Sequence, residues 1–339
     1  MIELESLVEL EQALEEEGFF GREDVVADVY LGYGLSRSLR RTREPGPPEP
    51  CRLPPAAVSI RAPGDGHATV TGYSIGQWER TWSDEAYAAS IESVRTSIAR
   101  GDVYQVNLVQ HLSAPFDGDP AGLADALAPL APVHPSPLLG NGWAIVSASP
   151  ELFLARRGDR VWTCPIKGTR PLGEPVEGAK DLAEHVMIVD LERNDLSIVC
   201  EPGSVRWPEL AEEHRLAGVT HLVSRVEGRL RRDVTLTDLL EATFPGGSIT
   251  GAPKLAAIER IAQLEPVGRG ASMGALGRVY PNGDLELGLT IRTFAVADGR
   301  IHLWVGGGIV WDSDPAAEIE ESWVKARPLL ERVGSLALA

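Results

Sequence analysis

The dipeptide Asn282-Gly283 restricts the possible folds of this chain more than any other feature. It lies between two strand-like runs, 274–280 and 285–295, and this arrangement is a strong signal for a β-hairpin. Asp298-Gly299 turns the chain again into a third run at 300–305. A hairpin joins antiparallel strands, whereas parallel strands need long crossover connections. Together with the helical segments, these turns predict an α+β fold, not a doubly wound parallel sheet.

Hydrophobic periodicity predicts the other elements. Cap residues and apolar residues at helical spacing predict helices over 1–18, between Ser83 and Gly101, over 179–192 and 234–243, after Pro253, and from Pro315 to about Val333. Strands are predicted at 103–110, 143–148, 152–156 and 160–164. The proline-rich stretch Glu44–Pro50 is predicted to be a linker or surface loop. We therefore expect a short N-terminal segment with a proline-rich linker over 1–80 and a larger domain over 81–335.

Charge and cysteine content limit the possible partners. The formal net charge of −17 makes nucleic acid or an anionic membrane an unfavourable partner. No apolar run has the length of a membrane span, and the N-terminus lacks the basic start of a signal peptide. The three cysteines are odd in number and far apart, which favours a reducing compartment. We expect a cytoplasmic protein. An anionic small molecule could still bind at a local positive site or through a metal.

Lys167 is the strongest candidate for a reactive side chain. The chain has 32 basic residues, and only four of them are lysines, at positions 167, 180, 254 and 325. Arginine keeps its proton and cannot act as a nucleophile, whereas a desolvated lysine can. Lys167 follows the strand-like run 160–164 within the stretch 165–171, Pro-Ile-Lys-Gly-Thr-Arg-Pro. The alternative is that Lys167 is a solvated turn residue.

Two acidic pairs at helical spacing are candidate ligands for a metal. Glu318 and Glu321 are three residues apart, and Lys325 follows one turn later on the same helical face. Asp181 and Glu184 have the same spacing in the helix predicted over 179–192. Carboxylates from two helices could hold Mg²⁺, which prefers oxygen ligands. A solvated acidic face or salt bridges are the alternative.

Two glycine-rich segments offer close backbone approach and amide donors to an anion. These are Gly306-Gly307-Gly308 and Gly246-Gly247, and ordinary turns are the alternative. The glycine spacing from Gly246 to Gly251 resembles a P-loop, but Ala252-Pro253 follows where lysine and serine or threonine are required, so nucleotide phosphate binding is rejected. His221 alone indicates a structural histidine.

Taken together, these segments resemble the chorismate-utilising enzymes over about residues 83–332. The matching stretches are 101–108, 149–152, the Lys167 segment, 184–196, 244–254, 291–293, and 306–309 leading into 312–315. The resemblance implies a large, mostly antiparallel β-sheet sandwich with helices packed outside it. It also implies Mg²⁺ as cofactor and chorismate as substrate.

Within that family, three positions resemble the aminodeoxychorismate synthase component I branch. Gln105 stands where the water-adding members have a lysine, Lys167 stands where anthranilate synthases have alanine, and Gly246-Gly247-Ser248-Ile249 resembles that branch's loop. The expected reaction is amination of chorismate at C4 on the route to p-aminobenzoate and folate. Ammonia would come from a separate glutamine amidotransferase, because the chain has no evident glutaminase signature.

The resemblance also implies roles for individual residues. Lys167 would attack C2 and Glu151 would protonate the leaving hydroxyl. The positions of Glu184 and Glu321 match the family's Mg²⁺ ligands, with Asp181 and Glu318 behind them. The substrate would be held by Thr169, His221, Thr250, Gly251, Arg292, Gly307, Gly308 and Lys325.

The sequence departs from the family pattern in two places. The N-terminal segment is shorter than in typical members, and Ser272 stands where an aromatic residue is usual. The alternative activity is that of anthranilate synthase component I. The alternative of another class is an inactive chorismate-binding subunit, which the retained carboxylates and Lys167 disfavour.

Overall fold

The computed structural model describes residues 1–64, 72–171, 179–216 and 219–334. The helices are α1 Leu7–Glu16, α2 Asp84–Ala99, α3 Ala121–Leu127, α4 Ala179–Val199, α5 Leu236–Thr243, α6 Lys254–Leu264 and α7 Pro315–Arg332, with the 3₁₀ helices η2 Tyr33–Leu39 and η4 Gly247–Ile249. The strands are β1 Ile2–Leu4, β2 Val26–Leu31, β3 Ala56–Arg61, β4 Tyr73–Ile75, β5 Glu79–Arg80, β6 Gln105–Gly118, β7 Leu138–Leu139, β8 Trp143–Ser147, β9 Leu152–Arg157, β10 Arg160–Cys164, β11 Ile166–Pro171, β12 Arg206–Leu216, β13 Val219–Arg229, β14 Gly251–Ala252, β15 Ala275–Val279, β16 Leu285–Leu289, β17 Thr293–Ala297 and β18 Arg300–Ile309.

These strands form two antiparallel sheets. In the described chain, the larger sheet has the order β1-β3-β2-β15-β16-β9-β10-β13-β11, with β12 paired to β13. The smaller sheet has the order β14-β6-β18-β17-β8-β7, with β4 and β5 paired to β6. The predicted hairpin at Asn282-Gly283 joins β15 and β16. The α+β prediction of a mostly antiparallel sandwich is confirmed.

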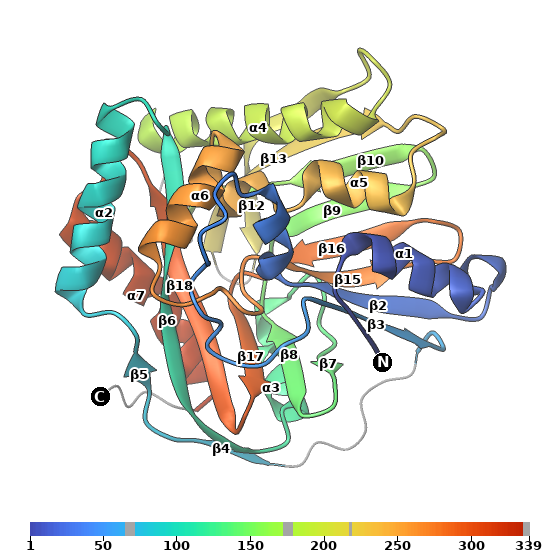
Figure 1. The fold of residues 1–339 in the computed structure, drawn as a ribbon, viewed down its shortest axis with the longest axis horizontal. Coiled ribbons are helices and arrows are strands. Elements are labelled where there is room, and N and C mark those ends of the chain that lie inside the picture. The colour runs from blue at the N-terminus through green and yellow to red at the C-terminus, as the bar shows by residue number, and fades with distance from the viewer. Residues whose placement is uncertain (65–71, 172–178, 217–218, 335–339) are drawn as a thin grey trace.

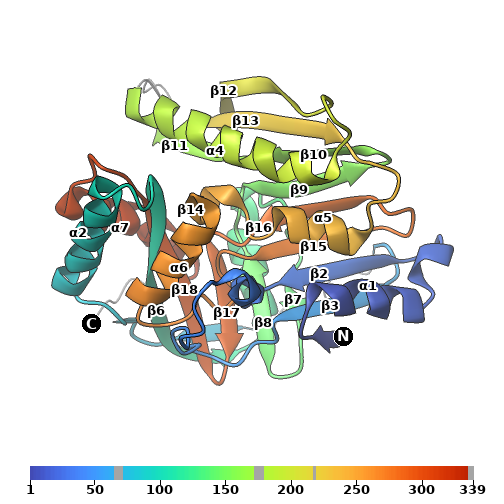
Figure 2. The same cartoon turned by 45° about the horizontal axis from the view of Figure 1, so that its top comes forward.

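Helices cover the outer faces of both sheets. Figures 1 and 2 show α1, α5 and α4 over one face of the larger sheet, and α2 and α7 beside β6 and β18 of the smaller one. The larger hydrophobic core includes side chains of both sheets, such as Leu108 and Leu287. A second core lies on the other face of the smaller sheet, where Leu303 and Phe294 contact side chains of α3 and α7. No helix of the described residues has the length and apolarity needed to cross a membrane.

Strand β18 divides its side chains between these two cores. Ile301, Leu303 and Val305 belong to the second core, while Trp304 belongs to the larger one, as the two-residue period of a strand requires. Gly306-Gly307-Gly308 continues this strand and pairs with β6. The alternative reading of the glycine run as a turn is therefore wrong.

Four expectations need correction or extension. The first residues of the predicted N-terminal helix form β1, and Ser6 caps α1 instead. The run 285–295 is two strands, because Arg292 adopts a positive φ of 49° between β16 and β17. Helix α4 continues to Val199, beyond the predicted 192. The strand predicted at 300–305 extends to Ile309. The division of the chain at residue 80 remains a prediction.

Helix α1 is tied to the start of α5. Glu11 on α1 accepts the backbone N–H groups of Leu236 and Thr237 at 3.0 and 2.9 Å. The same end of α5 carries a capping box between Thr235 and Asp238. The first turn of a helix leaves N–H groups without intrahelical partners, so both sets of acceptors stabilise it. The other end of α5 leads directly to the loop that contains η4.

Candidate active site

Lys167 lies on β11, at the end of the larger sheet. The register of β11 against β13 shifts between Lys167 and Thr169, where Gly168 adopts a positive φ of 64°. Lys167 is half-buried, and its Nζ donates to the carbonyl oxygen of Ser248 at 3.2 Å. The predicted nucleophile is therefore held against η4. The alternative of a fully solvated turn lysine is wrong.

Glu151 lies directly before β9 and is only 4% exposed. Ser248 Oγ donates to Glu151 Oε1 at 2.7 Å. Burial raises the pKa of the Glu151 carboxyl, although the Ser248 hydroxyl and the charges of Lys167 and Arg292 oppose the rise. A glutamic acid that keeps its proton to higher pH than usual suits a general acid.

Ser248 therefore connects the two predicted catalytic residues. Its carbonyl oxygen accepts from Lys167, and its hydroxyl donates to Glu151. The sequence pattern singled out the loop that contains Ser248 but assigned the serine no role. The available signal for such a role was a short polar residue directly after two glycines. A serine in a loop can form hydrogen bonds through both its backbone and its side chain.

Two more predicted residues lie near Glu151 and β11. His221 on β13 is buried, and burial, followed by the charge of Arg292, lowers the pKa of its imidazole to about 4. Burial lowers the pKa of the Arg292 guanidinium, and the charge of Glu151 opposes this fall. His221 is thus neutral near pH 7. The structure brings Arg292 close to Glu151 and His221, as a site around them requires.

Thr250 and Gly251 make close contacts with other residues of the protein. Thr250 Oγ1 donates to the carbonyl oxygens of Gly246 and Gly247 at 3.0 and 3.2 Å. Gly251 has a φ of 143°, and a Cβ on it would collide with the backbone of Gln105. A Cβ on Gly308 would collide with the side-chain amide of Gln105. These contacts explain the glycines by packing, and substrate binding at Thr250, Gly251 and Gly308 remains a prediction.

A second group of predicted residues gathers around Gly307 on β18. A Cβ on Gly307 would lie 3.3 Å from Glu321 Oε1, 3.4 Å from Lys325 Nζ and 3.6 Å from Glu318 Oε2. Lys325 Nζ lies 2.8 Å from Glu321 Oε1 and donates to the carbonyl oxygen of Gly306 at 2.8 Å. Ser313 Oγ donates to Glu318 Oε1 at 2.6 Å. The predicted shared face of α7 is confirmed.

These carboxylates fit a Mg²⁺ site in their chemistry. The carboxylates of Glu321 and Glu318 both lie beside Gly307, and carboxylate oxygens are the ligands that Mg²⁺ prefers. Glu184 is half-buried on α4. The side chains of Asp181 and Thr169 lie outside the described residues. The Mg²⁺ ligand set therefore remains a prediction.

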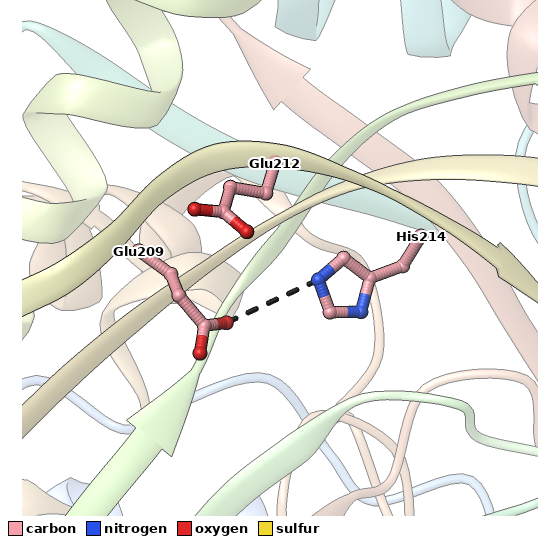
Figure 3. A group of neighbouring side chains, drawn as sticks. All are labelled: Glu209, Glu212 and His214. Carbon is pink, nitrogen blue, oxygen red and sulfur yellow. Dashed lines mark ion pairs between the residues drawn. The ribbon is translucent and has the colours of Figure 1, made fainter.

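A different set of possible metal ligands lies on the exposed strand β12. Glu209, Glu212 and His214 have ligand atoms within 4.8 Å of one another, and His214 Nε2 lies 3.9 Å from Glu209 Oε2 (Figure 3). A register shift between Glu209 and Glu212 brings the three to one face. They are not the residues that the acidic spacing singled out, and solvated acidic groups often cluster without an ion.

Two buried residues of α4 had no predicted role. His185 on α4 is fully buried, and neither ring nitrogen has a hydrogen-bond partner among the residues that the structure describes. Burial and the charge of Lys167 lower its pKa to about 4. Glu192, on the same helix, is 4% exposed. Ser272, at the position where the resemblance leads one to expect an aromatic residue, is fully buried, and its backbone N–H donates to the carbonyl oxygen of Arg269.

The chorismate binding enzyme family matches residues 39–331. This chain belongs to that family. The match begins nearer the N-terminus than the resemblance over 83–332 predicted, and includes the end of η2.

The proteins that are similar to this chain include anthranilate synthases and aminodeoxychorismate synthases. The chain is 39% identical over 327 residues to anthranilate synthase component 1 of Streptomyces coelicolor, covering 92% of this chain and 60% of that protein. It is 42% identical over 271 residues to aminodeoxychorismate synthase component 1 of Klebsiella aerogenes, covering 76% and 60%. The chain thus spans about 60% of the length of these relatives.

A solved structure agrees with the fold. The chain matches anthranilate synthase component I of Streptococcus pneumoniae with a TM-score of 0.78 and 26% identity. The match covers 89% of this chain and 80% of that one. This similarity agrees with the two-sheet architecture predicted for the family.

Proposed function

We propose that this protein aminates chorismate at C4 to give 4-amino-4-deoxychorismate. The observation that carries the proposal is the Ser248 bridge, which joins a half-buried lysine to a buried glutamic acid. The reaction needs both an amine nucleophile and a proton donor in one site. By the resemblance described above, anthranilate synthases typically have alanine at the position of Lys167.

The proposed first step uses both groups. The Lys167 amine, without its extra proton, forms a bond to C2 of chorismate. The C1–C2 double bond shifts to C1–C6, the C5–C6 double bond shifts to C4–C5, and the C4–oxygen bond breaks. Glu151 gives its proton to the departing oxygen, which leaves as water. The raised pKa of Glu151 supports this role.

Ammonia then completes the exchange. It bonds to C4, the two double bonds return to their original places, and the C2–nitrogen bond to Lys167 breaks. Glu151, now ionised, accepts the proton that the incoming ammonia must lose. We propose a separate glutamine amidotransferase as the ammonia source.

The remaining groups would hold the two carboxylates of the substrate. Arg292 and Lys325 provide positive charge, and neutral His221 would lie against the ring. Glu321 and Glu184, with Asp181 and Glu318 behind them, would hold Mg²⁺, which when bound neutralises a substrate carboxylate. Lys325 already lies 2.8 Å from Glu321 Oε1, so its charge is compatible with a carboxylate-rich neighbourhood.

Anthranilate synthesis is the second candidate, and it is favoured by the relatives of that name. One experiment separates the two. Purified protein is incubated with chorismate, Mg²⁺ and ammonium, and the products are identified by mass. The proposal expects 4-amino-4-deoxychorismate without pyruvate. Fluorescent anthranilate with pyruvate as the main product would overturn the assignment, and bound but unchanged chorismate would indicate an inactive subunit.

A further inference from the structure

Glu192 is a buried carboxyl close to the proposed catalytic pair. It lies on α4 and is 4% exposed. Its Oε1 accepts the backbone N–H of Gly247 at 2.9 Å. The Gly247 backbone also fits closely against α4, because a Cβ there would lie 2.7 Å from Leu191 Cδ2 and 3.0 Å from Glu192 Oε1. Glu192 therefore fastens the first residue of η4 to α4.

The residue after Gly247 is the bridge of the proposed site. Ser248 accepts from Lys167 through its carbonyl oxygen and donates to Glu151 through its hydroxyl. The next carbonyl, that of Ile249, accepts from the buried Arg269 at 2.9 Å. Each residue of η4 is thus held by a side chain from a different part of the chain. A displacement of Gly247 would move both contacts of Ser248.

Three charged residues lie around Glu192. Asp195 lies one turn along α4, Lys254 on α6 forms an ion pair with Asp195, and Glu151 lies beyond Ser248. Burial, followed by the charge of Asp195, raises the pKa of Glu192 to about 7, while Lys254 and the Gly247 N–H oppose the rise. A buried carboxyl is costly, so an apolar side chain would fill the same space with less penalty.

We propose that Glu192 is a positioning residue of the active site: it holds Gly247 and thereby sets the place of the Ser248 bridge between Lys167 and Glu151. The inference rests on the proposed amination for its kinetic consequences. The clamp itself is a property of the folded protein. It can therefore be tested by a measurement that does not depend on turnover.

Two substitutions separate the hydrogen bond from the charge. Glu192→Gln keeps an oxygen acceptor for Gly247, whereas Glu192→Leu removes it at similar volume. Asp190→Asn is the matched control, because Asp190 is an exposed carboxyl on the same helix that pairs with Arg193. Hydrogen exchange of the 245–252 segment and the kinetics of amination are measured for all of them.

The expected results differ between the variants. Glu192→Leu should speed exchange in 245–252 and lower kcat by about 100-fold, the effect of a misplacement of ~1 Å, with KM changed by less than about threefold. Glu192→Gln should keep exchange slow and kcat within about threefold of wild type. Asp190→Asn should match wild type in both. Wild-type exchange and kcat in Glu192→Leu would overturn the inference.

The pH profile supplies a readout that a structural role would not move. The charge of Glu151 raises the pKa of Glu192. Repulsion between two carboxylates is mutual, so an ionised Glu192 should raise the pKa of Glu151 in turn. Glu192→Gln should therefore shift the alkaline limb of kcat/KM to lower pH. An unchanged limb would contradict the electrostatic contact between the two carboxyls.

If Glu192→Leu does not fold, Gly247→Ala tests the same contact from the other side. The added methyl would push η4 away from Leu191 and Glu192, so kcat should fall while Asp190→Asn stays active. Wild-type kcat in folded Gly247→Ala would count against the clamp. Failure of the proposed function is recognised separately, as a wild-type protein that forms no aminodeoxychorismate but shows the expected difference in exchange.

Discussion

Lys325 and Glu321 form an ion pair across one turn of α7, with Lys325 Nζ 2.8 Å from Glu321 Oε1. The same amine donates to the carbonyl oxygen of Gly306 on β18. The pair is half-exposed, so it contributes little to stability by itself. Its consequence is local: the Glu321 carboxylate is held beside Gly307.

Glu321→Ala is expected to abolish Mg²⁺-dependent turnover, because it removes one of the two carboxylates that converge on Gly307. Chorismate turnover is measured during Mg²⁺ titration, together with thermal stabilisation by Mg²⁺ alone. Glu320→Ala is the control, since Glu320 is exposed and pairs with Arg327. Normal Mg²⁺ dependence in Glu321→Ala would exclude the proposed ligand.

Lys167→Ala is expected to slow amination strongly, because no other group would form the bond to C2. Lys167→Arg should not restore the rate, since arginine keeps its proton. Initial rates and the mass of the protein under turnover are measured. Wild-type rates in Lys167→Ala would rule out a covalent step.

Glu151→Gln is expected to lower kcat by about 10²–10⁴-fold, the usual contribution of a positioned general acid. In wild type, kcat/KM should fall as pH rises through the raised pKa of Glu151, because only the protonated form donates. Glu286→Gln, an exposed carboxyl that pairs with Arg157, should leave the profile unchanged. A profile of Glu151→Gln identical to wild type would remove Glu151 from the reaction.

The contribution of Glu151 to the stability of the folded protein should also fall as pH rises. The pKa of Glu151 is raised in the folded state above its ordinary value of 4.5. Its contribution to stability is therefore complete below that ordinary value and is lost as pH rises through the raised one. The midpoint of thermal unfolding of wild type, relative to Glu151→Gln, should fall across this range. A constant difference between the two would contradict the burial argument.

Gly308→Ala is expected to lower the free energy of unfolding by about 1–3 kcal/mol, the usual effect of overpacking. The new methyl would collide with the side chain of Gln105. Denaturant unfolding provides the measurement. Gly21→Ala is the control, because a Cβ there meets nothing within 4 Å. Equal stability of the two variants would show that Gln105 moves aside.

Local signals predicted much of the fold because they act over a few residues. The Asn282-Gly283 hairpin and the cap at Ser83 lie where turn and cap chemistry place them. The break at Arg292 was not predicted, since an arginine carries no signal for positive φ. Strand β12 was not predicted either, because its many charged residues hide the alternation of a strand.

The site was less predictable than the fold. Helical spacing placed Glu318 and Glu321 on one face, which is a local property. The bridge through Ser248 and the clamp through Glu192 join segments that are far apart in the sequence, and only tertiary packing brings them together. Burial, which sets the pKa of His185 and His221, is likewise a tertiary property.

The contact between Glu11 and the first turn of α5 has a practical consequence for chimeras between relatives. The opposite end of α5 leads into the loop that contains Ser248. Helix α5 therefore connects α1 with the loop of the proposed active site. Replacing the first twenty residues by a segment without an acceptor at the position of Glu11 would leave the amides of Leu236 and Thr237 without that partner. Recombination that transplants α1 and α5 as a unit would preserve this connection.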